Sequence, residues 1–100
     1  MKVFAEAFSA SGFTGGINWY RNMSRNWRRS ENLDHTVRVP ALMIMAADDR
    51  ILPPSAADGM EALVPDLEKF LVENSGHWTQ QEQPETVSAK LIEWRRRRFG

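Results

Sequence analysis

Three polar residues in two loops are the candidates for chemistry in this 100-residue chain. Asp48 and Asp49 follow the apolar run of residues 41–46, and His77 follows the run of residues 69–73. A carboxylate that accepts a hydrogen bond from one imidazole nitrogen fixes the ring tautomer and leaves the other nitrogen free as a general base. An Asp and His pair of this kind is one hypothesis, and ordinary polar residues in solvated loops are the alternative.

The two apolar runs are predicted to be strands that position these loops. Residues 41–46, ALMIMA, are apolar at every position, which is typical of a strand covered on both faces in a parallel sheet. Residues 55–64 are predicted to form a helix between the strands, with Ser55 as its cap and Gly59 as a weak point. This order indicates a βαβ unit of the α/β class, in which both loops open at the same edge of the sheet, where ligands bind.

Amphipathic helices are predicted before and after this unit. Residues 2–10 and residues 17–29 repeat apolar or aromatic side chains at helical spacing, and the second segment contains Tyr20. The Tyr20 hydroxyl could donate a proton, although an aromatic side chain on such a helix more often serves packing. Residues 74–83 are predicted to form a loop, and Pro84 suits the first turn of a last helix. The buried side of that helix is predicted to contain Val87, Leu91 and either Trp94 or Ile92.

Charge and composition exclude several classes of partner. Thirteen basic residues balance thirteen acidic ones, so no overall field draws the chain to nucleic acid, and the arginines at 95–98 are interpreted as a solvated helix end. There is no cysteine, only two histidines, and no glycine-rich phosphate-binding motif, so neither a metal nor a cofactor is predicted. No apolar stretch approaches the roughly 20 residues of a membrane span and no signal peptide is evident, so a cytoplasmic protein is expected.

Three segments resemble the last part of epoxide hydrolases of the α/β-hydrolase fold, the group that includes the soluble epoxide hydrolases. They are SGFTGGINWYRNMSRNW, VPALMIMAADDRILPP and SGHWTQQEQPETV. The resemblance implies an α/β fold in which residues 1–36 are the end of a helical cap. Residues 37–100 would then be the C-terminal part of the hydrolase core, with its last two parallel strands and their helices.

The same resemblance implies a role for each candidate. Tyr20 matches a cap tyrosine that donates a hydrogen bond to the epoxide oxygen, Asp49 rather than Asp48 matches the acid that orients the histidine, and His77 matches the base that activates water. In that family an aspartate nucleophile opens the epoxide to an alkyl-enzyme ester, which water then hydrolyses to a vicinal diol. The side chains that we expect to line the substrate pocket are Met23, Ile51 and Trp78.

Some parts of the family pattern have no counterpart in the sequence. No segment corresponds to the nucleophile turn, to the HGxP stretch of the oxyanion hole, or to a second cap tyrosine, all of which precede the matched region in the family. The 100-residue chain alone is therefore expected to lack epoxide hydrolase turnover, and to pair with the missing N-terminal part or to self-associate.

Two other interpretations stay open. A haloalkane dehalogenase shares the fold and the aspartate nucleophile, but it requires a halide-binding tryptophan pair where the epoxide hydrolases have tyrosine donors, so Tyr20 counts against it. A non-catalytic remnant that pairs with another chain through its exposed strand edge and aromatic helix is the alternative outside the enzyme class.

Overall fold

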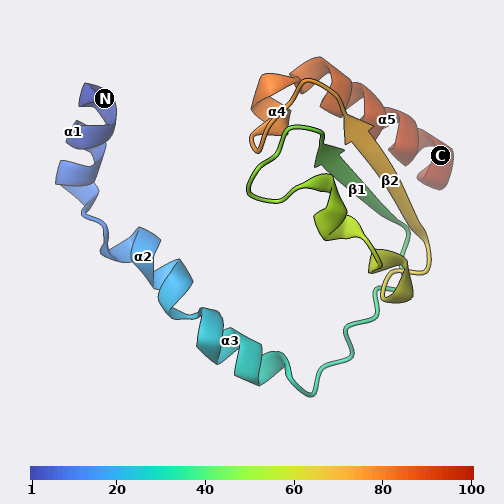
Figure 1. The fold of residues 1–100 in the computed structure, drawn as a ribbon, viewed down its shortest axis with the longest axis horizontal. Coiled ribbons are helices and arrows are strands. Elements are labelled where there is room, and N and C mark those ends of the chain that lie inside the picture. The colour runs from blue at the N-terminus through green and yellow to red at the C-terminus, as the bar shows by residue number, and fades with distance from the viewer. The chain divides into compact units, whose positions relative to one another are not determined.

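The computed structural model describes residues 1–100 and divides the chain into two compact units (Figure 1). The helical unit comprises Met1–Asp34 and the sheet unit comprises His35–Gly100. This division lies two residues before the boundary expected between residues 36 and 37. The assignment of the helical unit to a cap stays a prediction.

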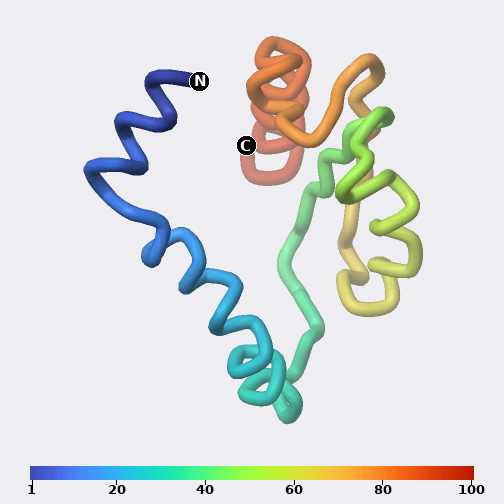
Figure 2. Tube along the Cα trace, turned by 60° about the vertical axis from the view of Figure 1, so that its left-hand side comes forward, coloured from blue at the N-terminus to red at the C-terminus, as the bar shows by residue number.

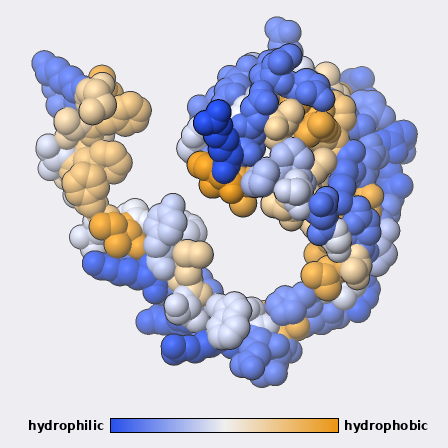
Figure 3. Space-filling model, viewed as in Figure 1, coloured by the Kyte–Doolittle hydropathy of each residue, from blue (hydrophilic) through white to orange (hydrophobic).

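The helical unit consists of three short helices without a core. They are α1 (Lys2–Ser11), α2 (Thr14–Arg21) and α3 (Met23–Ser30), and none of them contains a buried residue. The predicted helix over residues 2–10 is confirmed as α1. The rings of Phe8 and Phe13 stack with their centroids 4.8 Å apart, but most large apolar side chains of this unit lie on its surface (Figure 3).

The single helix predicted over residues 17–29 is wrong, because the chain ends one helix and begins another at Asn22. The side-chain amide of Asn22 donates a hydrogen bond of 2.8 Å to the carbonyl oxygen of Asn18. A side chain that bonds the backbone in this way competes with the regular helical pattern. The aromatic periodicity that suggested one helix therefore extends over two.

The sheet unit is built on two adjacent parallel strands, β1 (Ala41–Ala46) and β2 (Leu67–Val72). Their register runs from Ala41 opposite Leu67 to Ala46 opposite Val72, so both strands end at the same level. The first predicted strand is confirmed, and the second begins two residues before residue 69. Most side chains of β1 are only half-buried within the chain, so the predicted cover on both faces is incomplete.

The connection between the strands is not the helix predicted over residues 55–64. It contains two short 3₁₀ helices, η1 (Pro54–Ala57) and η2 (Met60–Ala62). Gly59 lies between them at φ 80°, a left-handed conformation that ends one helical turn before the next begins. The predicted cap at Ser55 is also wrong, because Pro53 is the N-cap residue and no side chain caps η1.

The last helix, α5 (Pro84–Phe99), and the connection between the strands cover opposite faces of the sheet (Figure 2). Lys90 of α5 bonds the carboxylate of Glu68 at 2.6 Å, and its ammonium lies 5.2 Å from the centroid of the Phe70 ring. Lys69, whose side chain points to the other face, pairs with Glu61 of η2 at 2.6 Å. The sheet is thus the middle layer of three.

The start of α5 at Pro84 is confirmed, whereas its predicted buried side is only partly correct. Val87 and Trp94 are half-buried as expected, but Leu91 and Ile92 are exposed. Lys90 lies toward the sheet instead, because its long side chain reaches the carboxylate of Glu68. No helix of the chain has the length and apolar character that crossing a membrane requires.

An ion-pair network of Glu68, Lys90, Glu93 and Arg97 ties α5 to β2. Lys90, and next Arg97, hold the pKa of Glu68 below its usual value, while Arg97 and then Lys90 lower the pKa of Glu93. Beside this network, Arg98 pairs with Asp66. The arginines at 95–98 were interpreted as a solvated helix end. Two of them instead attach the helix to the sheet unit, because Arg97 pairs with Glu68 of β2 and Arg98 pairs with Asp66 directly before β2.

Candidate functional site

The ends of the two strands bring two loops together at one edge of the sheet. The N–H of Ala47 donates to the carbonyl of Val72 at 2.9 Å, and the N–H of Asp48 donates to the carbonyl of Ser75 at 2.9 Å. These bonds extend the contact between the chain segments beyond Ala46, where β1 ends. Side chains that follow the strands are thereby held within reach of one another.

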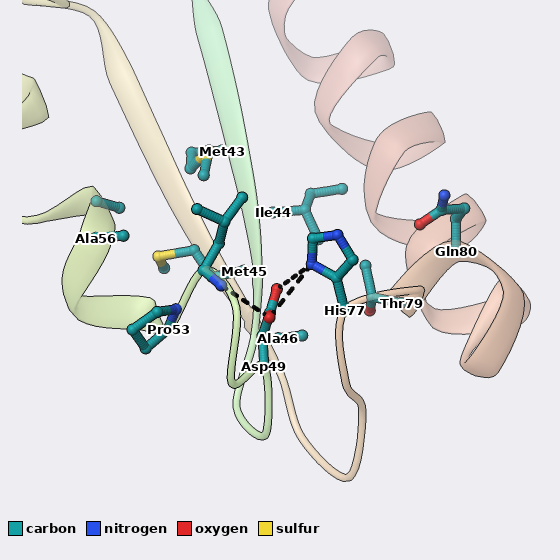
Figure 4. Close-up of a pocket in the computed structure, with 12 residues that line it drawn as sticks. Met43, Ile44, Met45, Ala46, Asp49, Pro53, Ala56, His77, Thr79 and Gln80 are labelled. Carbon is teal, nitrogen blue, oxygen red and sulfur yellow. Dashed lines mark hydrogen bonds and ion pairs between the residues drawn. The ribbon is translucent and has the colours of Figure 1, made fainter. Parts of the chain in front are cut away.

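Asp49 is fixed by the backbone of its own loop. Its Oδ1 accepts hydrogen bonds of 2.9 Å from the N–H groups of Ile51 and Leu52. Its side chain is only 9% exposed, and its second oxygen, Oδ2, lies 3.0 Å from Nδ1 of His77 (Figure 4). The carboxylate is oriented toward the imidazole by bonds that do not involve the histidine.

His77 faces Asp49 through a single ring nitrogen. Because an ionised carboxylate only accepts hydrogen bonds, the proton on Nδ1 is assigned to this contact and Nε2 is left without a hydrogen-bond partner in the chain. The side chain of His77 is 34% exposed, and the indole of Trp78 lies edge-on to the imidazole at 5.7 Å. This arrangement can accept a proton at Nε2 and stabilise the resulting imidazolium.

Hydrogen bonds keep the Asp49 carboxyl in its charged form. The N–H of Leu52 is the largest cause of a pKa below the usual value, and the His77 bond and the N–H of Ile51 act in the same direction. Loss of water around the carboxyl opposes them without reversing the shift. Asp49 therefore presents a negative charge to His77 at neutral pH.

The loop that carries His77 is more ordered than the sequence predicts. Asn74 adopts a left-handed backbone with φ 51°, and its carbonyl accepts a bond of 3.2 Å from the amide of Gln83. Ser75 is 1% exposed, and its hydroxyl bonds the Thr79 hydroxyl at 2.8 Å. The short helix α4 (Thr79–Glu82) lies within this segment, and it was missed because one turn gives no periodic pattern.

A hollow of about 370 Å³ adjoins the Asp49 and His77 pair. Apolar side chains of β1 and of the connection form most of its wall, and only a few polar groups reach it. Its lining includes Met43, Met45, Leu52, Pro53, Ala56 and Thr79 (Figure 4). Sequence reasoning missed these residues because a side chain that lines a wall has the same pattern as one that fills a core.

The side chains predicted to line a substrate pocket, Met23, Ile51 and Trp78, are exposed. The side chains of Ile51 and Trp78 are exposed and do not line this hollow. Met23 is the first residue of α3 and is exposed, and Tyr20 lies in α2 with 76% of its surface accessible. Contact of these four side chains with substrate stays a prediction.

No group of three or more His, Cys, Asp or Glu side chains in the chain is arranged to hold a metal ion. Asp48 is exposed beside Asp49, and no side-chain contact links it to His77. The titratable side chains that contact each other at this edge are therefore Asp49 and His77.

Comparisons with known proteins identify the family to which the chain belongs. Residues 2–84 match the family described as the alpha/beta hydrolase fold. Bifunctional epoxide hydrolase 2 of Mus musculus is 41% identical over 95 residues, which are 94% of this chain and 17% of the mouse protein. Epoxide hydrolase A of Mycobacterium tuberculosis is 40% identical over 89 residues, which are 87% of this chain and 28% of that protein.

A solved structure gives the same result. The crystal structure of epoxide hydrolase A from Mycobacterium thermoresistibile matches with a TM-score of 0.74 and 41% identity, over 89% of this chain and 28% of that one. The chain thus spans between about a sixth and somewhat more than a quarter of the length of these relatives. By its sequence and its structure, the chain belongs to the α/β hydrolase fold family and is similar to the epoxide hydrolases within it.

Proposed function

We propose that this chain supplies the general base of an epoxide hydrolase and the acid that orients it. The observation that carries the proposal is the 3.0 Å contact between Oδ2 of Asp49 and Nδ1 of His77 at the ends of two adjacent parallel strands. The similarity to epoxide hydrolases of mouse and mycobacteria supports the choice of substrate class.

In the proposed reaction, a carboxylate nucleophile attacks one epoxide carbon and the ring C–O bond breaks. The hydroxyl of Tyr20 gives its proton to the departing oxygen, which yields a hydroxyalkyl ester and a tyrosinate. The aspartate nucleophile is required by the family pattern, and no segment of residues 1–100 matches it. Tyr20 is suited to this step by its exposed hydroxyl, which has no hydrogen-bond partner within the helical unit.

His77 acts in the second step. Its Nε2 takes a proton from water, the water oxygen attacks the ester carbonyl carbon, and the bond from that carbon to the alkyl oxygen breaks. The imidazolium returns its proton to the alkoxide, so the vicinal diol leaves, and the remaining carboxyl proton restores the tyrosine. Asp49 stabilises the imidazolium between these proton transfers, because its charge is held 3.0 Å from Nδ1.

The chain by itself is proposed to have no turnover, because the base has no ester to hydrolyse without a nucleophile. The test therefore replaces the matching segment of epoxide hydrolase A from Mycobacterium thermoresistibile with this chain, which is 41% identical to it. We expect the hybrid protein to convert a simple aryl epoxide to its diol, measured by chromatography, and the 100-residue chain alone to form none.

Two neighbouring aspartates provide a matched control in the hybrid protein. Asp49→Asn keeps the size of the side chain but removes the charge that orients His77, and should slow diol formation by roughly 10³-fold to 10⁴-fold. Asp48→Asn, at an exposed position, should leave the rate unchanged. Equal losses in the two variants, or a correctly folded hybrid protein that forms no diol, would contradict the proposal.

A further inference from the structure

The last residue of α4, Glu82, turns back toward the loop that carries His77. Its Oε2 accepts a hydrogen bond of 2.6 Å from the N–H of Gly76, the residue directly before the histidine. A carboxylate bond to a backbone N–H is stronger than a bond between neutral groups. Neither the motif reasoning nor the proposed reaction gives Glu82 a role.

Gly76 leaves more room for this contact than any other residue type. A Cβ at this position would lie 3.2 Å from Oε1 of Glu82, which is tighter than most Cβ contacts, and 3.5 Å from Oε2, which is an ordinary contact. The backbone of Gly76 does not adopt a positive φ, which is found at other glycines of the chain such as Gly59. Glycine at position 76 therefore gives the carboxylate room for its close approach and does not serve an unusual backbone conformation.

The rest of the loop shows why one bond to Gly76 matters. Ser75 is held on both sides, by the N–H of Asp48 at its carbonyl and by Thr79 at its hydroxyl. The hydrogen-bonding contact of the His77 side chain is with Asp49, and Gly76 links the anchored serine to this histidine. The peptide between Ser75 and Gly76 is thus bonded at its carbonyl by the N–H of Asp48 and at its own N–H by Glu82.

We infer that Glu82 is a positioning residue for His77, acting through the N–H of Gly76. Its carboxylate bonds the N–H of the peptide between Ser75 and Gly76, whose carbonyl is bonded by Asp48, and this peptide sets the direction in which the chain continues to His77. The catalytic meaning of this inference rests on the proposed function of His77. The positioning itself is a property of the chain and is measurable without a substrate.

The test uses nitrogen NMR of the imidazole side chains in the 100-residue chain at neutral pH. The chain has only two histidines, so the exposed His35 is an internal reference for His77. In the wild-type chain, we expect the nitrogen shifts of His77 to indicate one tautomer with the proton on Nδ1. In Glu82→Ala, we expect them to move toward the tautomer mixture of His35, and the Gly76 amide to exchange with solvent about tenfold faster.

Two further variants distinguish positioning from general damage. Glu82→Gln keeps an oxygen that can accept the Gly76 bond, so it should restore the wild-type tautomer of His77. Glu85→Ala removes a similar carboxylate in the first turn of α5, and should change neither the His77 shifts nor the Gly76 exchange rate. A change in His77 that appears equally in Glu85→Ala would contradict the inference.

Gly76→Ala tests the contact from its other side and keeps the inference falsifiable should Glu82→Ala unfold. The added methyl group would press on Oε1 of Glu82 at 3.2 Å, so the His77 shifts should change in the same direction as in Glu82→Ala. Adding Glu82→Ala to Gly76→Ala should then have little further effect on His77. Unchanged His77 shifts in a folded Glu82→Ala or Gly76→Ala chain would overturn the inference, whether or not the hybrid protein hydrolyses epoxides.

Discussion

The two units of the chain hold their candidate residues in different ways. In the sheet unit, Asp49 is oriented by two backbone N–H groups and His77 by Asp49, at the ends of strands in fixed register. In the helical unit, Tyr20 lies on a helix with no buried residue, and its hydroxyl has no partner within that unit. A side chain at a strand end is positioned by the chain itself, whereas one on an uncovered helix is positioned only by its own short helix.

The same difference applies to stability. The sheet unit contains the buried apolar residues of the chain, which are Ala46, Ala57, Val64 and Val72. The helical unit exposes aromatic side chains that normally stabilise by burial, including Phe4, Trp19 and Trp27. Helices of 8 to 10 residues are marginal in water without tertiary packing. We therefore expect amide protection to concentrate in the sheet unit.

The largest expected effect is on the residue that the sheet unit fixes most fully. His77→Gln in the hybrid protein should reduce steady-state diol formation by roughly 10⁴-fold, because the variant lacks a general base for ester hydrolysis. The measurement is the initial rate at saturating epoxide, with the folded state checked by circular dichroism. A loss below about tenfold would mean that another group activates the water.

Tyr20→Phe tests whether the helical unit takes part in the reaction. Losing the hydroxyl should slow ring opening in the hybrid protein by roughly tenfold to a hundredfold, since the family pattern contains a second tyrosine that can donate. Unfolding free energy should change by less than about 0.5 kcal/mol, because the side chain is exposed. A rate equal to that of the unmodified hybrid protein in rapid-mixing experiments would remove Tyr20 from the mechanism.

One substitution, glycine to alanine, should have opposite effects in the two units. Gly59→Ala places a side chain at φ 80° in the sheet unit and should cost about 1–2 kcal/mol in urea unfolding. Gly15→Ala lies within α2, where nothing is within 4 Å of the new methyl group, and should favour the helix by about 0.5–1 kcal/mol. Helix content from circular dichroism reports the second change. If both variants were destabilising, or both stabilising, the contrast between the units would be contradicted.

The smallest expected effect is on the stability of the fold at acid pH, and only the sheet unit should show it. Lys90 and then Arg97 lower the folded-state pKa of Glu68 below the value of about 4.3 expected in the unfolded chain. This contribution to stability is present above about pH 4.3 and is lost as the pH falls through the folded-state pKa. Glu68→Gln should therefore make stability less dependent on pH in this acid range.

Urea unfolding at several acid pH values measures this dependence. Glu31→Gln, at an exposed position of the helical unit, is the matched control and should keep the wild-type slope. An unchanged slope in Glu68→Gln would show that the ion-pair network does not contribute to the stability of the sheet unit.

The sequence predicted the parts of the fold that repeat a simple pattern. The continuous apolar run of β1 and the proline at the start of α5 were sufficient to locate these elements. The prediction of a single helix over residues 17–29 was wrong. The spacing of aromatic residues does not reveal that the side chain of Asn22 bonds the backbone carbonyl of Asn18. The connection over residues 55–64 was mistaken for a helix because the sequence does not reveal that Gly59 adopts a left-handed conformation. That conformation depends on tertiary structure.

The candidate site shows the same limit. The approach of Asp49 and His77 could be expected once the strands were taken as parallel neighbours, since both loops then follow strand ends at one edge. The choice of Asp49 over Asp48 came from the family resemblance, and its physical reason, the N–H groups of the loop, is visible only in the structure. Glu82 was missed because its partner is a backbone N–H, and every residue type except proline has such a group.

The most direct test of the central claim is the intact mass of the His77→Gln hybrid protein after mixing with an epoxide. If His77 activates the water and takes no part in ring opening, the ester forms and is not hydrolysed, so the protein gains the mass of one substrate molecule. The unmodified hybrid protein should show this adduct only briefly. A His77→Gln hybrid protein that is folded and never gains mass would contradict the assignment of His77 as the base of the second step.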